Sequence, residues 1–143
     1  MNDRAILFPL LAQVLLAYII AVVLLRRRVA EMRAKRVHPQ AVAQARDMAS
    51  RLDDQRASDS FRNQFETPVL FFVAVLVIHV AKLADPTYVA LAWVYVALRY
   101  GHAGIHCTYN KVMHRFAVFL AGFFALALIW ARLAFDLVYA GLR

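Results

Sequence analysis

The stretch Asp59–Ala81, "DSFRNQFETPVLFFVAVLVIHVA", places a polar cluster directly before a long apolar run. The cluster contains Arg62, Asn63 and Glu66, and Pro68 opens the apolar part. A run of this length and composition is typical of a membrane-spanning helix, and ionisable groups at membrane depth are costly and usually functional. The stretch therefore indicates a class of protein and a candidate site together.

Apolar residues make up 63% of the 143-residue chain, against about 45–50% in a soluble domain. The first run, about residues 5–25, is long enough at ~1.5 Å per residue to cross a hydrocarbon core of ~30 Å. Three arginines follow it where a secretory signal would have a cleavage site, so we expect it to remain as a span. Further runs cover about residues 67–84, 88–109 and 116–139. The sequence predicts an all-α integral membrane protein, a single domain of residues 1–143 with four transmembrane helices.

The distribution of lysine and arginine predicts the orientation of these spans. Ten of them lie in residues 26–66, three lie in residues 99–115, and the turn "KLADPT" holds only Lys82. Because basic segments are retained in the cytoplasm, we expect residues 26–66 to be cytoplasmic and both termini to be external. A basic face against anionic lipid accounts for the net charge of +8, so no nucleic acid partner is expected.

Polar residues of the second and third spans lie at matched depth. Glu66 precedes the outer turn by about as many residues as His102 and His106 follow it, which places all three ~25–30 Å from that turn. Each belongs to a set spaced at i, i+3 and i+4, the spacing of one helix face. The two sets are Asp59, Arg62, Asn63 and Glu66, and Arg99, His102, His106 and Tyr109.

Pro68 leaves two interpretations of the second span open. Thr67 can cap a helix that starts at Pro68, which would leave Arg62 and Glu66 in a loop. Alternatively, a helix begins at about Asp59 and continues through Pro68 with a kink. Only the second interpretation places the polar set on one helix face.

Other chemistries find little support in the sequence. Cys107 is the only cysteine, so no intramolecular disulfide and no cysteine-rich metal site can form. Nucleotide-binding glycine loops, a GxSxG elbow and an HExxH pair are also absent. A haem-binding or proton-conducting bundle could use four of the five histidines, but one of the four differs from the others in depth and two share one helix. These are His79, His102, His106 and His114; neither haem nor a metal is expected.

Four predicted spans, "RNQFETPVLFF" and "RYGHAGIHCTYNKVMHRF" together resemble the MAPEG family, the membrane-associated proteins in eicosanoid and glutathione metabolism. The chain is most similar to short bacterial members, and the resemblance covers almost all of it. It implies a homotrimer of four-helix bundles in a bacterial inner membrane. It also implies that glutathione binds between adjacent subunits near the cytoplasmic face.

The resemblance assigns roles residue by residue. It implies that the glutathione-binding residues are Arg62, Asn63, Glu66, Arg99, His102, His106, Arg27 and Arg28, and that Arg115 is the catalytic cation. Glu66 would bind the ammonium group of glutathione and arginines its two carboxylates, while Arg115 would favour the thiolate. The chain departs from the family pattern at Asp59, His106, Phe116 and Phe119. An arginine, a tyrosine and two hydroxyl residues, respectively, are common at these positions.

The implied function is that of a glutathione S-transferase or peroxidase acting on lipophilic electrophiles or hydroperoxides. Glutathione would be a co-substrate that brings its own nucleophile, so Cys107 is not required for the chemistry. The alternative is a non-catalytic trimer that binds lipid or a partner protein. The two phenylalanines favour the alternative, whereas the retained Arg62, Asn63, Glu66 and Arg115 favour the enzyme.

Overall fold

The computed structural model describes residues 3–140, and all regular elements of this part of the chain are helical. The α-helices are α1 (Leu7–Ala34), α2 (Ala45–Arg51), α3 (Arg56–Arg62), α4 (Thr67–Val80), α5 (Pro86–Cys107) and α6 (Val112–Ala140). Short 3₁₀ helices are η1 (Asp3–Ile6), η2 (Pro39–Val42) and η3 (Asn63–Phe65). Three helical segments are long and apolar enough to cross a membrane, namely Arg4–Ala34, Arg56–Val80 and Val112–Tyr139.

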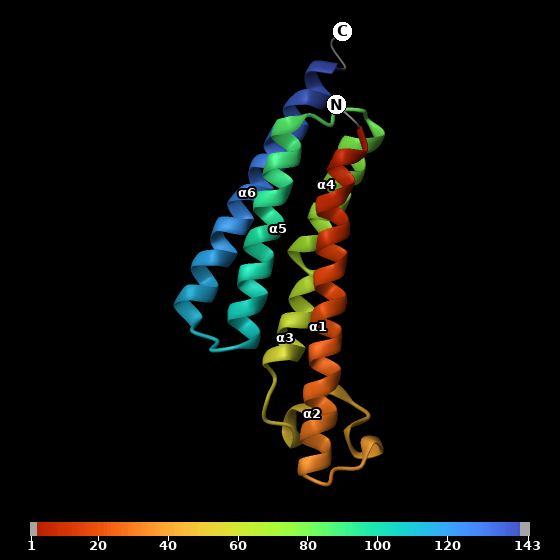
Figure 1. Cartoon of the computed structure of the whole chain (residues 1–143), viewed down its shortest axis with the longest axis vertical. Coiled ribbons are helices and arrows are strands. Elements are labelled where there is room, and N and C mark those ends of the chain that lie inside the picture. Colours follow the sequence, from red (N-terminus) through yellow and green to blue (C-terminus); the bar gives the residue numbers. More distant parts are fainter. Residues whose placement is uncertain (1–2, 141–143) are drawn as a thin grey trace.

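The long helices form a bundle in which successive helices run in opposite directions (Figure 1). α5 and α6 lie side by side, and α1 packs against α3, α4 and α5. α1 begins and α6 ends at the same end of the bundle, while α2 folds back along the far end of α1 (Figure 1). The end that carries α2, where α1 extends beyond α5 and α6, is the one for which the sequence predicts a cytoplasmic location.

The bundle interior is apolar and centred on aromatic side chains from α4 and α5. The rings of Phe71 and Tyr95 stack with centroids 4.5 Å apart, and both side chains are fully buried. Large apolar side chains also cover the outside of the bundle, including Phe123, Phe124 and Leu128 on α6. Extensive exposed apolar surface marks a membrane or protein contact, so the outside matches the membrane-spanning composition.

The segment before Pro68 combines features of both interpretations of the sequence. The chain is helical from Arg56 onward, but α3 tightens into η3 and the backbone breaks at Glu66, where φ is −97° and ψ is −104°. α4 then restarts at Thr67 with Pro68 in its first turn. Since proline has no N–H group, the helix cannot continue its hydrogen-bond pattern through this position. The break gives Glu66 a direction that an unbroken helix would not provide.

The segment between α1 and α3 is tied to its neighbours by charged side chains. Lys35 contacts Glu31 and Asp53, at 2.8 Å in both cases. Arg56 pairs with Asp54 at 2.8 Å and donates a second hydrogen bond to the carbonyl oxygen of Thr108. The guanidinium group of Arg56 holds the pKa of the Asp54 carboxyl below its usual value. These contacts fix the entry to α3 against the end of α5.

Candidate functional site

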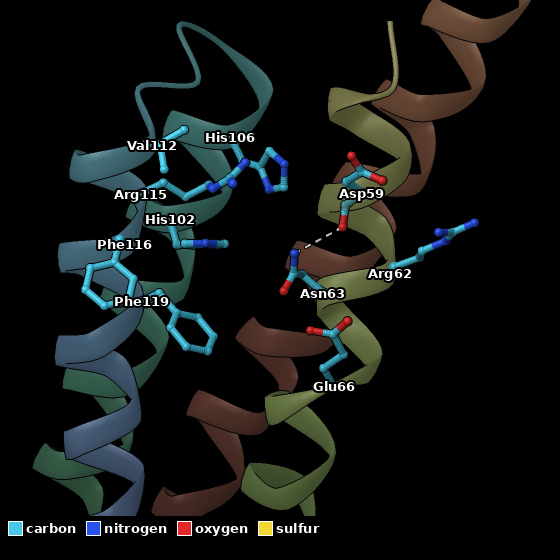
Figure 2. A pocket seen from close by; sticks show the side chains of 10 residues that line it. All are labelled: Asp59, Arg62, Asn63, Glu66, His102, His106, Val112, Arg115, Phe116 and Phe119. Atoms are coloured by element: carbon cyan, nitrogen blue, oxygen red, sulfur yellow. Dashed lines mark hydrogen bonds between the residues drawn. The ribbon is translucent and has the colours of Figure 1, made fainter. Parts of the chain in front are cut away.

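A cavity of about 470 Å³ opens between two walls of the bundle (Figure 2). One wall comes from α3, η3 and the junction at Glu66, and the other from α5 and α6. The lining residues are Asp59, Arg62, Asn63, Glu66, His102, His106, Val112, Arg115, Phe116 and Phe119. The structure thus brings together residues that the sequence places at one depth on separate helices.

The first wall is acidic. Asn63 and Glu66 extend from this wall toward the cavity and Asp59 lines it on α3, whereas the guanidinium group of Arg62 extends away from it (Figure 2). Asn63 donates from its side-chain Nδ2 to the backbone carbonyl oxygen of Asp59 at 3.2 Å. This wall therefore presents two carboxylates and one amide, and its arginine takes part only through its stem.

The second wall is formed by two buried histidines and an arginine. The rings of His102 and His106 meet edge to face with centroids 5.7 Å apart, and each side chain is only 3% exposed. Their Nδ1 atoms are buried without a hydrogen-bond partner among the described residues. Arg115 reaches the same region from the first turn of α6 (Figure 2). Phe119 closes this wall, with its ring centroid 5.8 Å from that of His102.

Arg99 lies outside the cavity lining. Its side chain is 2% exposed, and its Nη2 donates to the backbone carbonyl oxygen of Asn63 at 2.6 Å. The remaining Nε and Nη1 have no partner in the described part of the chain. Arg99 thus connects α5, the helix of the opposite wall, to Asn63, where it positions the junction between α3 and α4.

The arginines at the end of the first span lie apart from this cavity. Arg27 donates to the carbonyl oxygen of Cys107 at 2.5 Å and contacts Asp54 at 3.4 Å. Arg28 lines a small separate cleft with Arg27 and Glu31. Within one chain neither contributes to the cavity, so the assignment of Arg27 and Arg28 to glutathione stays a prediction about neighbouring subunits.

Asn110 is a site residue that sequence reasoning missed. It lies in the turn between α5 and α6 with φ at 49°, and its Oδ1 accepts a hydrogen bond from Nη1 of Arg115 at 2.8 Å. Asparagine tolerates this left-handed conformation better than most residues. An asparagine directly after the predicted end of a helix was the available signal, but its contact with Arg115 could not be deduced.

The remaining histidines show no common centre. The side chain of His114 lies at the start of α6, where a ring nitrogen is 3.2 Å from the hydroxyl of Tyr109. His79 lies in the last turn of α4. Within residues 3–140 no three His, Cys, Asp or Glu side chains group in a way that could hold a metal ion.

Apolar helices that surround a charged cavity near one end define a helical membrane protein with a polar site in its bundle. The family model of the MAPEG family matches residues 6–135, so the chain belongs to the MAPEG family. This range includes every residue that lines the cavity. The family contains glutathione-dependent transferases and peroxidases as well as non-catalytic members. No curated protein and no solved structure matches the chain.

Proposed function

We propose that this protein binds glutathione in the cavity and uses its thiolate to attack lipophilic electrophiles or hydroperoxides. The observation that carries the proposal is the opposition of Asn63 and Glu66 on one wall to Arg115 on the other, in a chain of the MAPEG family. Glutathione has both cationic and anionic groups. A cavity with opposed acidic and basic walls complements such a ligand.

The side chains suggest a role for each part of the ligand. Glu66 accepts hydrogen bonds from the ammonium group of glutathione, and Asn63 and His102 form hydrogen bonds with its peptide groups. Arg115 faces the thiol, because a cation beside a thiol lowers its pKa from about 8.5 toward 7 and so favours the nucleophilic thiolate. Charge-assisted hydrogen bonds of this kind are roughly twice as strong as neutral ones.

The apolar side of the cavity supports a substrate that comes from the membrane. Phe116 and Phe119 line it on α6, beside the exposed apolar surface of the same helix. An electrophile or hydroperoxide dissolved in lipid would reach the thiolate along these rings. A substrate that dissolves in lipid explains why the site lies in a membrane protein.

The proposal includes α5 as a fourth span and a trimeric assembly in a bacterial inner membrane. α5 is not one of the three segments named above as apolar enough to cross a membrane, but its 22 residues give about 33 Å, the thickness of a hydrocarbon core. A homotrimer would surround the charged groups near Arg27 and Arg28 with protein rather than lipid. Native mass spectrometry in several mild detergents tests the assembly. Only monomers or dimers would contradict it.

A second candidate is a non-catalytic trimer that binds lipid or a partner protein. The specific observation in its favour is the pair Phe116 and Phe119 in the cavity, since neither ring can donate a hydrogen bond to a developing charge. This candidate retains the same fold and the same cavity. It differs from the enzyme in having no turnover.

Calorimetric titration of the detergent-solubilised full chain with glutathione tests the proposal, followed by assays with an aryl halide and a lipid hydroperoxide. Binding with turnover supports the enzyme. Binding without thiolate formation or turnover supports the second candidate. No binding at millimolar glutathione rejects the proposed ligand.

A further inference from the structure

Asp59 places a carboxylate in the lining of the cavity without an ion pair to any described residue. Among the described residues its carboxylate takes part in no ion pair and accepts no hydrogen bond; only its backbone carbonyl oxygen does so, from Asn63. Figure 2 shows the Asp59 side chain on the wall opposite His106, while the guanidinium group of Arg62 extends away from the cavity. The negative charge of Asp59 is therefore available to a ligand.

Glu66 supplies a second carboxylate on the same wall, and its charge lies close enough to interact with that of Arg99. It likewise forms no ion pair in the described part of the chain, and its side chain points into the cavity (Figure 2). Seven residues separate the two positions, through the end of α3 and η3, which corresponds to roughly 10–12 Å at the rises of α- and 3₁₀ helices. An extended tripeptide has a similar length, so one end of a bound ligand lies near Glu66 and the other near Asp59.

The opposite wall is polar as well. The side chains of His102 and His106 line the cavity there (Figure 2). The guanidinium group of Arg115 on this wall donates to Asn110 through Nη1, and its proposed role is at the thiol rather than at the glycine end of the ligand.

Glutathione itself matches this charge pattern at one end only. With its ammonium group at Glu66, its glycine carboxylate would lie near the carboxylate of Asp59 and be repelled. We infer that the site takes a glutathione-type thiol whose glycine carboxylate is amidated, with an amine-bearing amide as the best fit. This inference rests on the proposed function and adds a specificity-determining residue, Asp59, to it.

Three thiols that differ only at the glycine end test the inference: glutathione, its primary amide and its aminopropyl amide. Their glycine ends carry negative, zero and positive charge. Attraction in place of repulsion at roughly 6 Å in water changes affinity about tenfold. Calorimetric titration of the wild-type full chain should therefore give dissociation constants that fall about tenfold from glutathione to the aminopropyl amide.

The variants assign the preference to one residue. Asp59→Asn should bind all three thiols with similar affinity, and Asp59→Arg should reverse the order. Asp47→Asn is the matched control, because it makes the same charge change on α2, outside the cavity lining. It should keep the wild-type order. Thermal unfolding of each variant checks that the fold is retained.

The outcomes separate this inference from the proposed function. If wild type binds glutathione as tightly as the aminopropyl amide, or if Asp59→Asn keeps the wild-type order, the inference is overturned and the proposed function stands. An Asp59→Asn variant that loses the trimer but keeps that order gives the same result, because Asp59 then serves assembly. If none of the three thiols binds, both fall.

Discussion

Nη2 of Arg99 donates a hydrogen bond of 2.6 Å to the backbone carbonyl oxygen of Asn63. The bond joins α5 to η3, the short 3₁₀ helix that lies between the two acidic residues of the first wall. Arg99 is almost completely buried, and its Nε and Nη1 have no partner among the described residues. A buried charge with one hydrogen bond is a poor source of stability, because its desolvation exceeds what a single bond returns. Its role is to position the wall.

Arg99→Met should separate stability from binding. Replacing an incompletely paired buried ion by an apolar side chain of similar volume is often neutral or stabilising by about 1–4 kcal/mol. We expect unchanged or higher thermal stability in detergent and weaker binding of glutathione, since the Asn63 carbonyl loses its donor. Calorimetry and thermal unfolding of the same preparations measure both. A parallel loss of stability and affinity would instead make Arg99 a structural residue.

The sequence predicted the helical class and that Glu66, His102 and His106 lie at one level of the bundle, because these depend on composition and on helix geometry alone. Counting residues from the outer turn was sufficient to bring Glu66 level with His102. The direction of Arg62 was not predictable, since it depends on the tightening of α3 into η3 before Pro68. The same limit applies to the buried bond from Gln13 to Gln64, at 3.0 Å, which joins residues 51 positions apart.

Glu66→Gln should weaken glutathione binding by about 1–3 kcal/mol, the range for loss of a charge-assisted hydrogen bond. Arg62→Ala should weaken it less, because the guanidinium group of Arg62 points away from the cavity (Figure 2). Calorimetric titration of both variants against wild type measures the difference. Equal losses would show that Arg62 contacts the ligand of a neighbouring subunit, and no loss in either would remove both residues from the binding site.

Asp85, in the turn between α4 and α5, should stabilise its end of the bundle in a pH-dependent way. Its Oδ1 accepts the backbone N–H of Tyr88 at 2.9 Å, and its Oδ2 pairs with Arg132 of α6. Burial opposes ionisation, but these donors outweigh it and hold the pKa of Asp85 below its usual value. Because the folded pKa is depressed, the stabilisation is complete above the pKa of unfolded aspartate and is lost as the pH falls through the folded pKa.

Asp85→Asn and Asp85→Ala separate the two contributions of Asp85 to stability, the ion pair with Arg132 and the N-cap hydrogen bond to Tyr88. Asparagine is as good an N-cap as aspartate, so Asp85→Asn should lose only the partly exposed ion pair, about 0.2–1 kcal/mol. Asp85→Ala should lose about 1 kcal/mol more with the cap. Thermal unfolding at neutral and acidic pH measures both, and the wild-type advantage over Asp85→Asn should vanish at acidic pH. An advantage that persists there would assign the effect to packing.

Single cysteines can test the orientation of the spans. In a Cys107→Ala background, Thr87→Cys lies in the first turn of α5 and Ser50→Cys in α2, both at exposed positions. A membrane-impermeant maleimide should label Thr87→Cys from outside intact cells and Ser50→Cys only after permeabilisation, since segments rich in lysine and arginine are generally retained in the cytoplasm. The opposite pattern would invert the bundle. Labelling of both from outside would remove α4 or α5 as a span.

The last prediction concerns Arg115 and separates an enzyme from a binding protein. Each pKa unit by which a cation stabilises the thiolate of bound glutathione corresponds to ~1.4 kcal/mol. Wild-type protein should therefore develop thiolate ultraviolet absorbance with glutathione near neutral pH. Arg115→Ala should lose this absorbance and all turnover of an aryl halide while it still binds glutathione through Glu66.

Asn110→Gly supplies the matched variant, because glycine keeps the positive φ of the turn but removes the acceptor of the 2.8 Å bond from Arg115. Arg115 keeps its charge in this variant and loses its fixed direction. The thiolate should then form at a higher pH than in wild type, and turnover should fall less than in Arg115→Ala. If Asn110→Gly and Arg115→Ala both retain wild-type thiolate absorbance, another group ionises the thiol. If wild type binds glutathione but forms no thiolate and turns over neither an aryl halide nor a lipid hydroperoxide, the protein is a non-catalytic binder.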